Sequence, residues 1–387
     1  MLTEVIIWIV FVWLAIPVAY FLVFATASLR RLPHGESSCE HHRRTVILIP
    51  AYHSDSCIAD TVQSALDQDY PSELFSVLVI SDGMEQSTIQ RLESAGAKVL
   101  EVHFENSTKA KSLQQAVRFL GADAFDVAVI LDADNIVGRD FLSRTDSAMD
   151  DGTRAVQAHR KAKNTDTPVA VIDAVSEEIN NSIFRHGHNA LGVSSALIGS
   201  GMAFEYAWLC ANADRFTTAG EDKEMELKLL EDGIFVKYLP DVEVLDEKTR
   251  TGQNYYNQRR RWIASQYHLF GNAMRRFSQV RDKSGYLDKL FQWMLPPRMI
   301  VIGLVPLMTL LLVIFKCSSW PAWLVLTVFL VIAMLLAVPA KMLDGKLLRA
   351  LLKVPVLAAM SVANLFRIKG TSTTNKSTKR LCGNSSK

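Results

Sequence analysis

Apolar residues gather at the two ends of the chain. From Val5 to Ala27 the sequence contains no charged residue, and at ~1.5 Å rise per residue a helix of this length crosses ~30 Å of hydrocarbon. Two further apolar runs, Met299 to Phe315 and Trp320 to Ala340, are separated by a short polar segment. The pattern predicts one membrane-spanning helix near the N-terminus and a hairpin of two near the C-terminus.

Basic residues flank these apolar runs and predict their orientation. Arg30, Arg31, Arg43 and Arg44 follow the first run, and residues 341–387 hold ten Lys and Arg against one acid, Asp344. Because basic residues favour the cytoplasmic side, we expect a multi-pass inner-membrane protein whose central domain and C-terminal tail are cytoplasmic. Residues 286–295 and 354–366 are apolar but short, so each is expected to lie in the membrane interface, with spanning left open for the second.

The central part of the chain alternates short apolar runs with helical patterns. Strands are predicted at 45–49, 76–80, 98–102 and 127–131, with helices near 58–66, 87–94 and 109–120 between them. Continuous apolar strands alternating with helices are typical of an α/β fold with a mostly parallel sheet covered on both faces. In such sheets ligands bind beyond the carboxyl ends of the strands.

Polar residues follow the predicted strands at that edge. Tyr52 comes after the first strand, Asp82 after the second, and Asp132 and Asp134 after the fourth. Two carboxylates at the end of a buried strand suit a divalent ion such as Mg²⁺ or Mn²⁺, which binds carboxylate and phosphate oxygens. A polar turn is the alternative interpretation of this pair, since turns are rich in Asp.

Composition narrows the classes of function. The 387 residues are 49% hydrophobic and 21% charged, and 42 Lys and Arg nearly balance 40 Asp and Glu, so bulk charge gives no indication of nucleic-acid binding. The five cysteines lie far apart, which argues against a zinc site and a disulfide framework. Neither a dinucleotide-binding nor a P-loop glycine pattern follows the first strand.

Several segments follow one another in an order that resembles a known family. They are Ile49–Tyr52, Ser64–Pro71, Ser81–Gly83, Lys109–Gln114, Asp132–Asp134, Gly199–Phe204, Gly220–Asp222, Gly233–Pro240 and Gln258–Trp262. Together they resemble family 2 glycosyltransferases with a GT-A fold, of the membrane-bound processive type that includes cellulose, chitin and hyaluronan synthases. The resemblance covers about residues 45–265 and implies a Rossmann-like sheet with flanking helices.

The resemblance also implies roles for individual residues. Asp222 would be the general base, with Glu221 sharing or supporting that role, and Arg261 would stabilise the departing diphosphate. Asp132 and Asp134 would hold Mg²⁺ or Mn²⁺. The nucleotide-sugar would contact Pro50, Ala51, Tyr52, Asp82, Lys109 and Asp132, and the acceptor would contact Ser200, Gly201, Gln258 and Trp262. Thr108 and Gln114 depart from the family pattern, which leaves open whether Lys109 or Lys111 faces the nucleotide.

The resemblance predicts an inverting glycosyltransferase that extends a β-linked glycan from a UDP-sugar. Transfer of a single sugar to a lipid-linked acceptor is a near alternative, and a catalytically inactive nucleotide-sugar-binding scaffold of a polysaccharide export complex is an alternative of another class. Three spans are few for a glycan channel, so export would need further subunits or self-association.

We therefore expect four parts along the chain. Residues 1–29 form the anchor, 44–285 the catalytic domain, 286–340 an interfacial segment with the hairpin, and 341–387 the basic tail.

Overall fold

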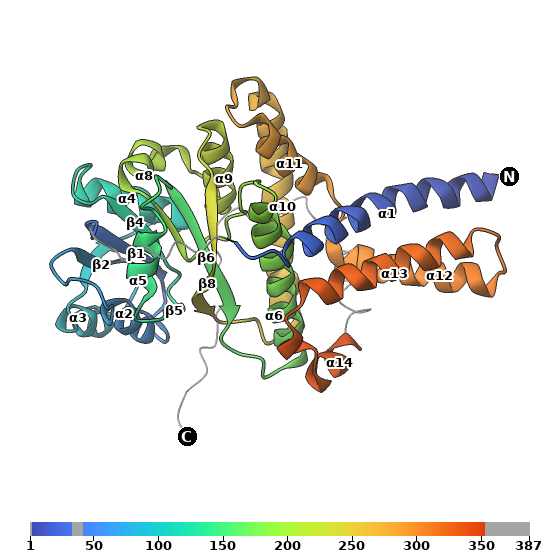
Figure 1. Ribbon diagram of the computed structural model, residues 1–387. Coiled ribbons are helices and arrows are strands. Elements are labelled where there is room, and N and C mark those ends of the chain that lie inside the picture. The colour runs from blue at the N-terminus through green and yellow to red at the C-terminus, as the bar shows by residue number, and fades with distance from the viewer. Residues whose placement is uncertain (1, 33–41, 353–387) are drawn as a thin grey trace.

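A body built on a β-sheet and a projecting bundle of apolar helices make up the protein (Figure 1). The computed structural model describes residues 2–32 and 42–352. The described strands form one mixed, mostly parallel sheet in the order β3-β2-β1-β4-β7-β6-β8-β5. Their bounds are β1 (Thr45–Tyr52), β2 (Phe75–Asp82), β3 (Lys98–Val102), β4 (Val127–Ile130), β5 (Ile136–Val137), β6 (Ala155–Ala162), β7 (Met202–Glu205) and β8 (Val236–Asp246).

Helices cover both faces of the sheet, as the buried strands require. Val46 and Leu48 of β1 face α4, α8 and α9, whereas Ile47 and Ile49 face α2, α3 and α5. These helices are α2 (Ile58–Leu66), α3 (Gln86–Ser94), α4 (Lys109–Leu120), α5 (Phe141–Ser147), α8 (Tyr206–Asn212) and α9 (Glu221–Glu231). The predicted α/β architecture is confirmed, with β7 and β5 adding antiparallel pairs.

Two strands run past a proline, and the first of them extends beyond its predicted bounds of 45–49. The backbone N–H and C=O groups of the even-numbered residues of β1 point toward β4, and the pairing with β4 ends at Leu48. Pro50 can therefore lie inside β1. The missing N–H of Pro50 therefore costs no ladder hydrogen bond. In β8 the chain also continues beyond Pro240, and the pairing with β6 shifts register between Ala158 and His159. Beyond this irregularity β8 continues to Asp246, which lies at the carboxyl edge of the parallel strands.

Three apolar helices project from the body, with the N-terminus at their far end (Figure 1). α1 (Leu2–Ala27) and α13 (Trp320–Ala337) are long and apolar enough to cross a membrane, and a third span results if α11 (Lys283–Met294) and α12 (Arg298–Ile314), bent by 57°, count as one. The predicted hairpin is thus α12 and α13. The short helices η4 (Ala340–Met342) and α14 (Gly345–Leu351) follow, and residues 354–366 lie outside the described part of the chain.

Helix α6 (Pro168–Asn181) joins the body to the bundle. Val175 and Ile179 of α6 pack with residues of α1, α12 and α13 in one apolar cluster. The π-helical segment η1 (Ser182–Gly187) and α7 (His188–Ala190) continue from it. Gly187 lies so close to α1 that an added Cβ would stand 2.1 Å from the carbonyl oxygen of Phe24.

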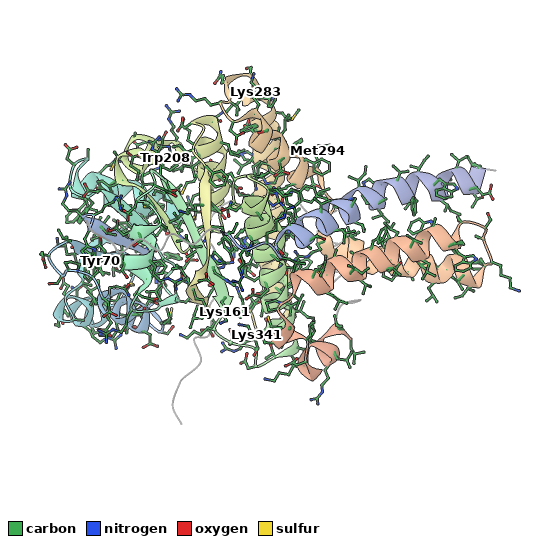
Figure 2. All side chains as sticks on the ribbon, in the orientation of Figure 1. Tyr70, Lys161, Trp208, Lys283, Met294 and Lys341 are labelled. Atoms are coloured by element: carbon green, nitrogen blue, oxygen red, sulfur yellow. The ribbon has the colours of Figure 1, made fainter. Side chains whose placement is uncertain are left out.

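The long helix α10 (Gly252–Arg276) stands beside α6, between the sheet and the bundle (Figure 1). The short helices η2 (Ala213–Arg215) and η3 (Phe277–Gln279) follow α8 and α10 respectively. Met294, at the end of α11, marks where the body meets the apolar helices (Figure 2). The body and the bundle therefore meet along α6, α10 and α11.

Candidate active site

A cavity of about 870 Å³ opens at the carboxyl edge of the sheet and extends to the apolar helices. Many of the residues that the sequence singled out line it together: Tyr52, Lys109, Asp132, Asp134, Glu221, Asp222, Gln258, Arg261 and Trp262. Pro50, Ala51, Asp82, Ser200 and Gly201 do not line it. The fold therefore brings most of the predicted residues to one cavity, although they come from widely separated segments.

Three carboxylates meet at the edge of the sheet. Asp132 and Asp134 follow β4, and Asp246 ends β8; one oxygen of each lies within 4.8 Å of the others. Asp134 and Asp246 are buried, whereas Asp132 is partly exposed. This close set of oxygen ligands fits a hard divalent ion, which accepts several carboxylates and completes its shell with phosphate or water.

A buried amide and a hydroxyl fix the loop that carries these acids. The side-chain oxygen of Asn135 accepts a 2.9 Å hydrogen bond from the Asp132 N–H, and its amide nitrogen lies 3.4 Å from both Asp134 and Asp246. Ser200 donates to Asn135 and accepts from the Asp132 N–H. Ser200 thus supports the acidic loop from behind, which its motif alone could not indicate.

Basic side chains offset the charge of the acids. Lys109 Nζ lies 2.6 Å from Asp132 Oδ1, and Lys248 Nζ lies 2.9 Å from Asp246 Oδ2. Burial lowers the pKa of Lys109, but Asp132 and Glu221 outweigh it and raise the pKa above the usual value. Lys109 therefore stays charged beside the acids.

Lys109 faces the site because α4 begins there. Thr108 caps the helix by accepting a hydrogen bond from the Lys111 N–H, and Lys109 also donates to the Gly199 carbonyl. Lys111 instead reaches the carbonyl of Asn106, 2.8 Å away and on the exposed surface. Of the two lysines that the sequence left open, Lys109 lines the cavity and Lys111 does not.

Glu221 and Asp222 lie at the start of α9, next to Gly199. A Cβ added to Gly199 would stand 3.7 Å from Asp222 Oδ2 and 3.8 Å from Glu221 Oε1. Burial raises the pKa of Glu221 to about 8, although Lys109 opposes the shift. Gly220, which precedes them, is needed because an added Cβ would meet the Ser265 hydroxyl of α10 at 2.1 Å. The N-terminus of α9 therefore packs closely against α10.

Asp82 lies at the end of β2, paired in register with Tyr52. Its side chain is 2% exposed, and its Oδ2 has no hydrogen-bond partner among the described residues. The backbone carbonyl of Asp82 accepts from the His53 N–H, and His53 lines the cavity. A buried carboxylate with an open acceptor, whose neighbours Tyr52 and His53 line the cavity, suits an N–H donor of a ligand.

Helix α10 supplies Gln258, Arg261 and Trp262 to the opposite wall. The Gln258 side-chain oxygen is buried without a hydrogen-bond partner among the described residues. The guanidinium of Arg259, between them in the motif, lies 4.8 Å from the centre of the Trp262 ring. A cation–π contact with Arg259 of the same helix thus holds the Trp262 ring.

Sequence reasoning missed Asp246 and a charged cluster behind it. Glu177 lies 3.0 Å from Arg160, 3.2 Å from Arg185 and 3.6 Å from Lys248. Burial would raise the pKa of Glu177, but these cations outweigh it and lower the pKa to about 2. Only the place of Asp246, directly after an apolar strand as with Asp82, could have pointed to it.

Comparisons with known proteins agree with this geometry. A family model described as glycosyltransferase like family 2 matches residues 42–265. An N-acetylglucosaminyltransferase of Rhizobium meliloti (strain 1021) is 25% identical over 238 residues, 57% of this chain and 55% of that protein. A putative cellulose synthase 2 of Komagataeibacter xylinus is 32% identical over 100 residues, 26% of this chain and 6% of that protein. The chain spans about half the length of the first relative and a small part of the second.

A solved structure supports the fold. The chain aligns with a mannosyltransferase from Pyrobaculum calidifontis in complex with GDP-Man and Mn²⁺ at a TM-score of 0.53 and 20% identity, over 83% of this chain and 97% of the other. At this identity the match speaks for the fold alone, and the predicted GT-A fold is confirmed.

Proposed function

The chain belongs to the glycosyltransferase like family 2 and is a glycosyltransferase, and we propose that it extends a β-linked glycan from a UDP-sugar with inversion. The observation that carries the proposal is the bridge made by Lys109. Its Nζ lies 2.6 Å from Asp132 and 3.9 Å from Glu221. One cation thereby lies between the acids that would hold the metal and the acids that would act on the acceptor.

The acceptor side of the reaction needs a base. In an inverting transfer an acceptor hydroxyl attacks the anomeric carbon opposite the diphosphate, so its proton must pass to a nearby carboxylate. We assign this role to Asp222, which lines the cavity at the start of α9. Glu221, whose pKa is raised to about 8, then supports the site as a mostly neutral neighbour.

The donor side needs positive charge on the leaving diphosphate. Asp132, Asp134 and Asp246 would hold Mg²⁺ or Mn²⁺, which supplies charge stabilisation to the diphosphate. Lys109 and Arg261 would add positive charge from the chain itself, with Arg suited to bidentate phosphate contacts. Asp82 would accept from the N–H of the uracil ring, and Tyr52 with Pro50 and Ala51 would line the nucleotide side.

The acceptor and the membrane setting are part of the same proposal. Gln258 and Trp262 would bind the acceptor sugar, Trp262 by stacking, with Ser200 and Gly201 shaping the loop beside it. α1, α12 and α13 would span the inner membrane, leaving residues 44–285 in the cytoplasm as the catalytic domain and 341–387 as a cytoplasmic tail. Export of a long product would require further subunits or self-association.

A second candidate is transfer to a lipid-linked acceptor. It is favoured by one observation: Phe21 of α1 and Met299 of α12 line the same cavity as the acids. A cavity open toward the apolar helices gives an amphiphile a route to the site.

Product analysis tests the proposal and separates these candidates. The full chain in detergent is given a panel of ¹⁴C-labelled UDP-sugars, Mg²⁺ or Mn²⁺, and membrane extract as the acceptor source. High-molecular-weight product that a β-specific glycosidase degrades supports glycan extension, and label that extracts into organic solvent supports the lipid acceptor. If UDP binds but no label is transferred from any donor, the protein is the nucleotide-sugar-binding scaffold instead.

A further inference from the structure

Two arginines that the transfer reaction does not use converge where the cavity meets the apolar helices. Arg259 of α10 donates from Nη2 to the Ser176 hydroxyl at 2.9 Å. Arg298, the first residue of α12, donates from Nη2 to the same oxygen at 2.7 Å. These nitrogens therefore lie within about 6 Å of each other, a separation at which two cations repel unless an anion lies between or beside them.

The carboxylates nearby do not balance this pair. Asp173 lies 3.3 Å from Arg259, and Glu177 is engaged by Arg160, Arg185 and Lys248. Within residues 2–32 and 42–352, Arg298 forms no ion pair: it donates to the neutral oxygens of Ser176 and Asn180. The pair thus carries two positive charges against one carboxylate.

Polar groups at this place also lack partners. The Nε atoms of Arg259 and Arg298 and the hydroxyl of Tyr255 are buried without a hydrogen-bond partner among the described residues. All three side chains line the cavity, and the guanidinium of Arg259 lies 4.9 Å from the centre of the Tyr255 ring. Buried donors left open around two cations are suited to the oxygens of a phosphate group.

The surroundings indicate where such a phosphate would come from. Arg298 follows the break at Pro296 and Pro297, where α11 turns by 57° into the apolar helix α12. Apolar side chains from α1, η1, α11, the α11–α12 break and α12 also line the cavity: Phe21, Phe184, Trp293, Leu295 and Met299. A ligand here would place an anionic head group on the arginines and an apolar chain among these residues.

We propose that Arg259 and Arg298 bind the phosphate of a membrane lipid whose apolar chain enters the cavity between α1 and the α11–α12 junction. Binding of this lipid phosphate does not depend on which nucleotide-sugar the protein uses. Its use in the reaction, presenting a lipid-linked acceptor to the site, rests on the proposed transferase function. The shared chemistry is a phosphate group, and the lipid rather than soluble phosphate is the source, because the arginines lie at the apolar end of the cavity.

Binding of farnesyl phosphate to the full chain in non-ionic detergent tests the proposal, followed by tryptophan fluorescence. Farnesol, which lacks the phosphate, and inorganic phosphate, which lacks the apolar chain, are the matched probes. We expect farnesyl phosphate to bind at least about tenfold more tightly than either probe, since charge-assisted hydrogen bonds to phosphate contribute about that much. Equal binding of farnesol would overturn the phosphate site, and equal binding of inorganic phosphate would overturn the lipid as its source.

Variants assign the effect to the arginines. Arg298→Gln and Arg259→Gln should each weaken farnesyl phosphate binding about tenfold or more, whereas Arg298→Lys should retain part of it. Arg275→Gln, at an exposed position in the last turn of the same helix α10, is the control and should bind as the unchanged protein does. Unaltered binding in both glutamine variants, with normal thermal unfolding, would refute the site.

UDP binding in the same samples separates this proposal from the transferase function. Arg298→Gln should leave UDP affinity unchanged, because Arg298 bonds to Ser176 and Asn180 of α6 and to none of the residues assigned to the donor. A parallel loss of UDP affinity would assign Arg298 to the donor instead and overturn the lipid site. Intact lipid binding in a protein that transfers no sugar would reject the transferase function alone.

Discussion

Lys109 Nζ lies 2.6 Å from Asp132 Oδ1, inside a cavity that also holds Glu221 and Asp222. A nearly buried lysine that is paired with an acid at this place is positioned to form an ion pair with the diphosphate of the proposed donor. Asp132 is also one of the three carboxylates that lie together with Asp134 and Asp246 at the edge of the sheet. The contact between Lys109 and Asp132 therefore contributes both to the structure of the site and to its proposed chemistry.

We predict that Lys109→Gln lowers kcat/KM for the UDP-sugar about a hundredfold, because the positive charge that would stabilise the leaving diphosphate is removed. Steady-state UDP release measures the effect. Lys111→Gln is the matched control on the same helix turn, and it should change the rate less than about twofold because Lys111 does not line the cavity and bonds to the Asn106 carbonyl at the surface. Equal losses in both variants would contradict the assignment of Lys109.

Asp246 provides a second prediction. Asp246→Asn should weaken Mn²⁺ binding about tenfold or more, since one of three charged oxygen ligands becomes a neutral amide. Titration of Mn²⁺ followed by electron paramagnetic resonance measures it on the full chain. Glu243→Gln removes an acid from the same strand that pairs with Lys161 on the surface, and it should leave Mn²⁺ affinity unchanged. Unaltered affinity in Asp246→Asn would remove Asp246 from the metal site.

The raised pKa of Glu221 predicts how stability depends on pH. Between the ordinary Glu pKa and about 8, the unfolded chain loses this proton while the folded chain keeps it, so stability falls as the pH rises through this window. Glu221→Gln removes the titrating group. Thermal unfolding in EDTA without donor should therefore show a decline in Tm from pH 5.5 to 8.5 that is about 3 °C smaller in the variant. Identical declines would show that burial does not hold this proton.

The contact between Gly187 and α1 gives a prediction about the anchor. Gly187→Ala would place a Cβ 2.1 Å from the Phe24 carbonyl oxygen, and the forced separation should cost about 2 kcal/mol of unfolding free energy. Gly271→Ala, at a helical glycine with open space around it, should be neutral or stabilise by up to about 1 kcal/mol. Thermal unfolding of the detergent-solubilised chain compares them. If Gly187→Ala unfolds no earlier than Gly271→Ala, α1 does not pack as described.

Much of the fold could be predicted from local pattern. The third predicted strand and the helix at 109–120 match β3 and α4 at both ends, because apolar periodicity and a Thr cap act over a few residues. The first strand was predicted to end at residue 49 but runs through Pro50 to Tyr52, since the effect of a proline depends on which neighbouring strand its position faces. That information lies in the sheet, not in the segment.

The site shows the same division. Asp132, Lys109 and Asp222 belong to motifs with fixed spacing and could be singled out. Asp246 and Arg298 belong to no such motif, and their importance comes from neighbours far away in the sequence: Asp246 gains its role beside Asp132 and Asp134 after β4, and Arg298 from Ser176 on α6. Motif spacing indicates local chemistry, whereas charge balance inside a cavity appears only when the chain is folded.

The central claim is metal-dependent transfer from a UDP-sugar, and UDP release by the purified full chain tests it most directly. The assay supplies a panel of UDP-sugars with Mg²⁺ or Mn²⁺, and compares the unchanged protein with Asp222→Asn and Asp134→Ala. We predict release from one donor, abolished by EDTA and reduced about a thousandfold or more in both variants. Release that persists in EDTA or in Asp222→Asn, or a failure of UDP to bind at all, would contradict the account.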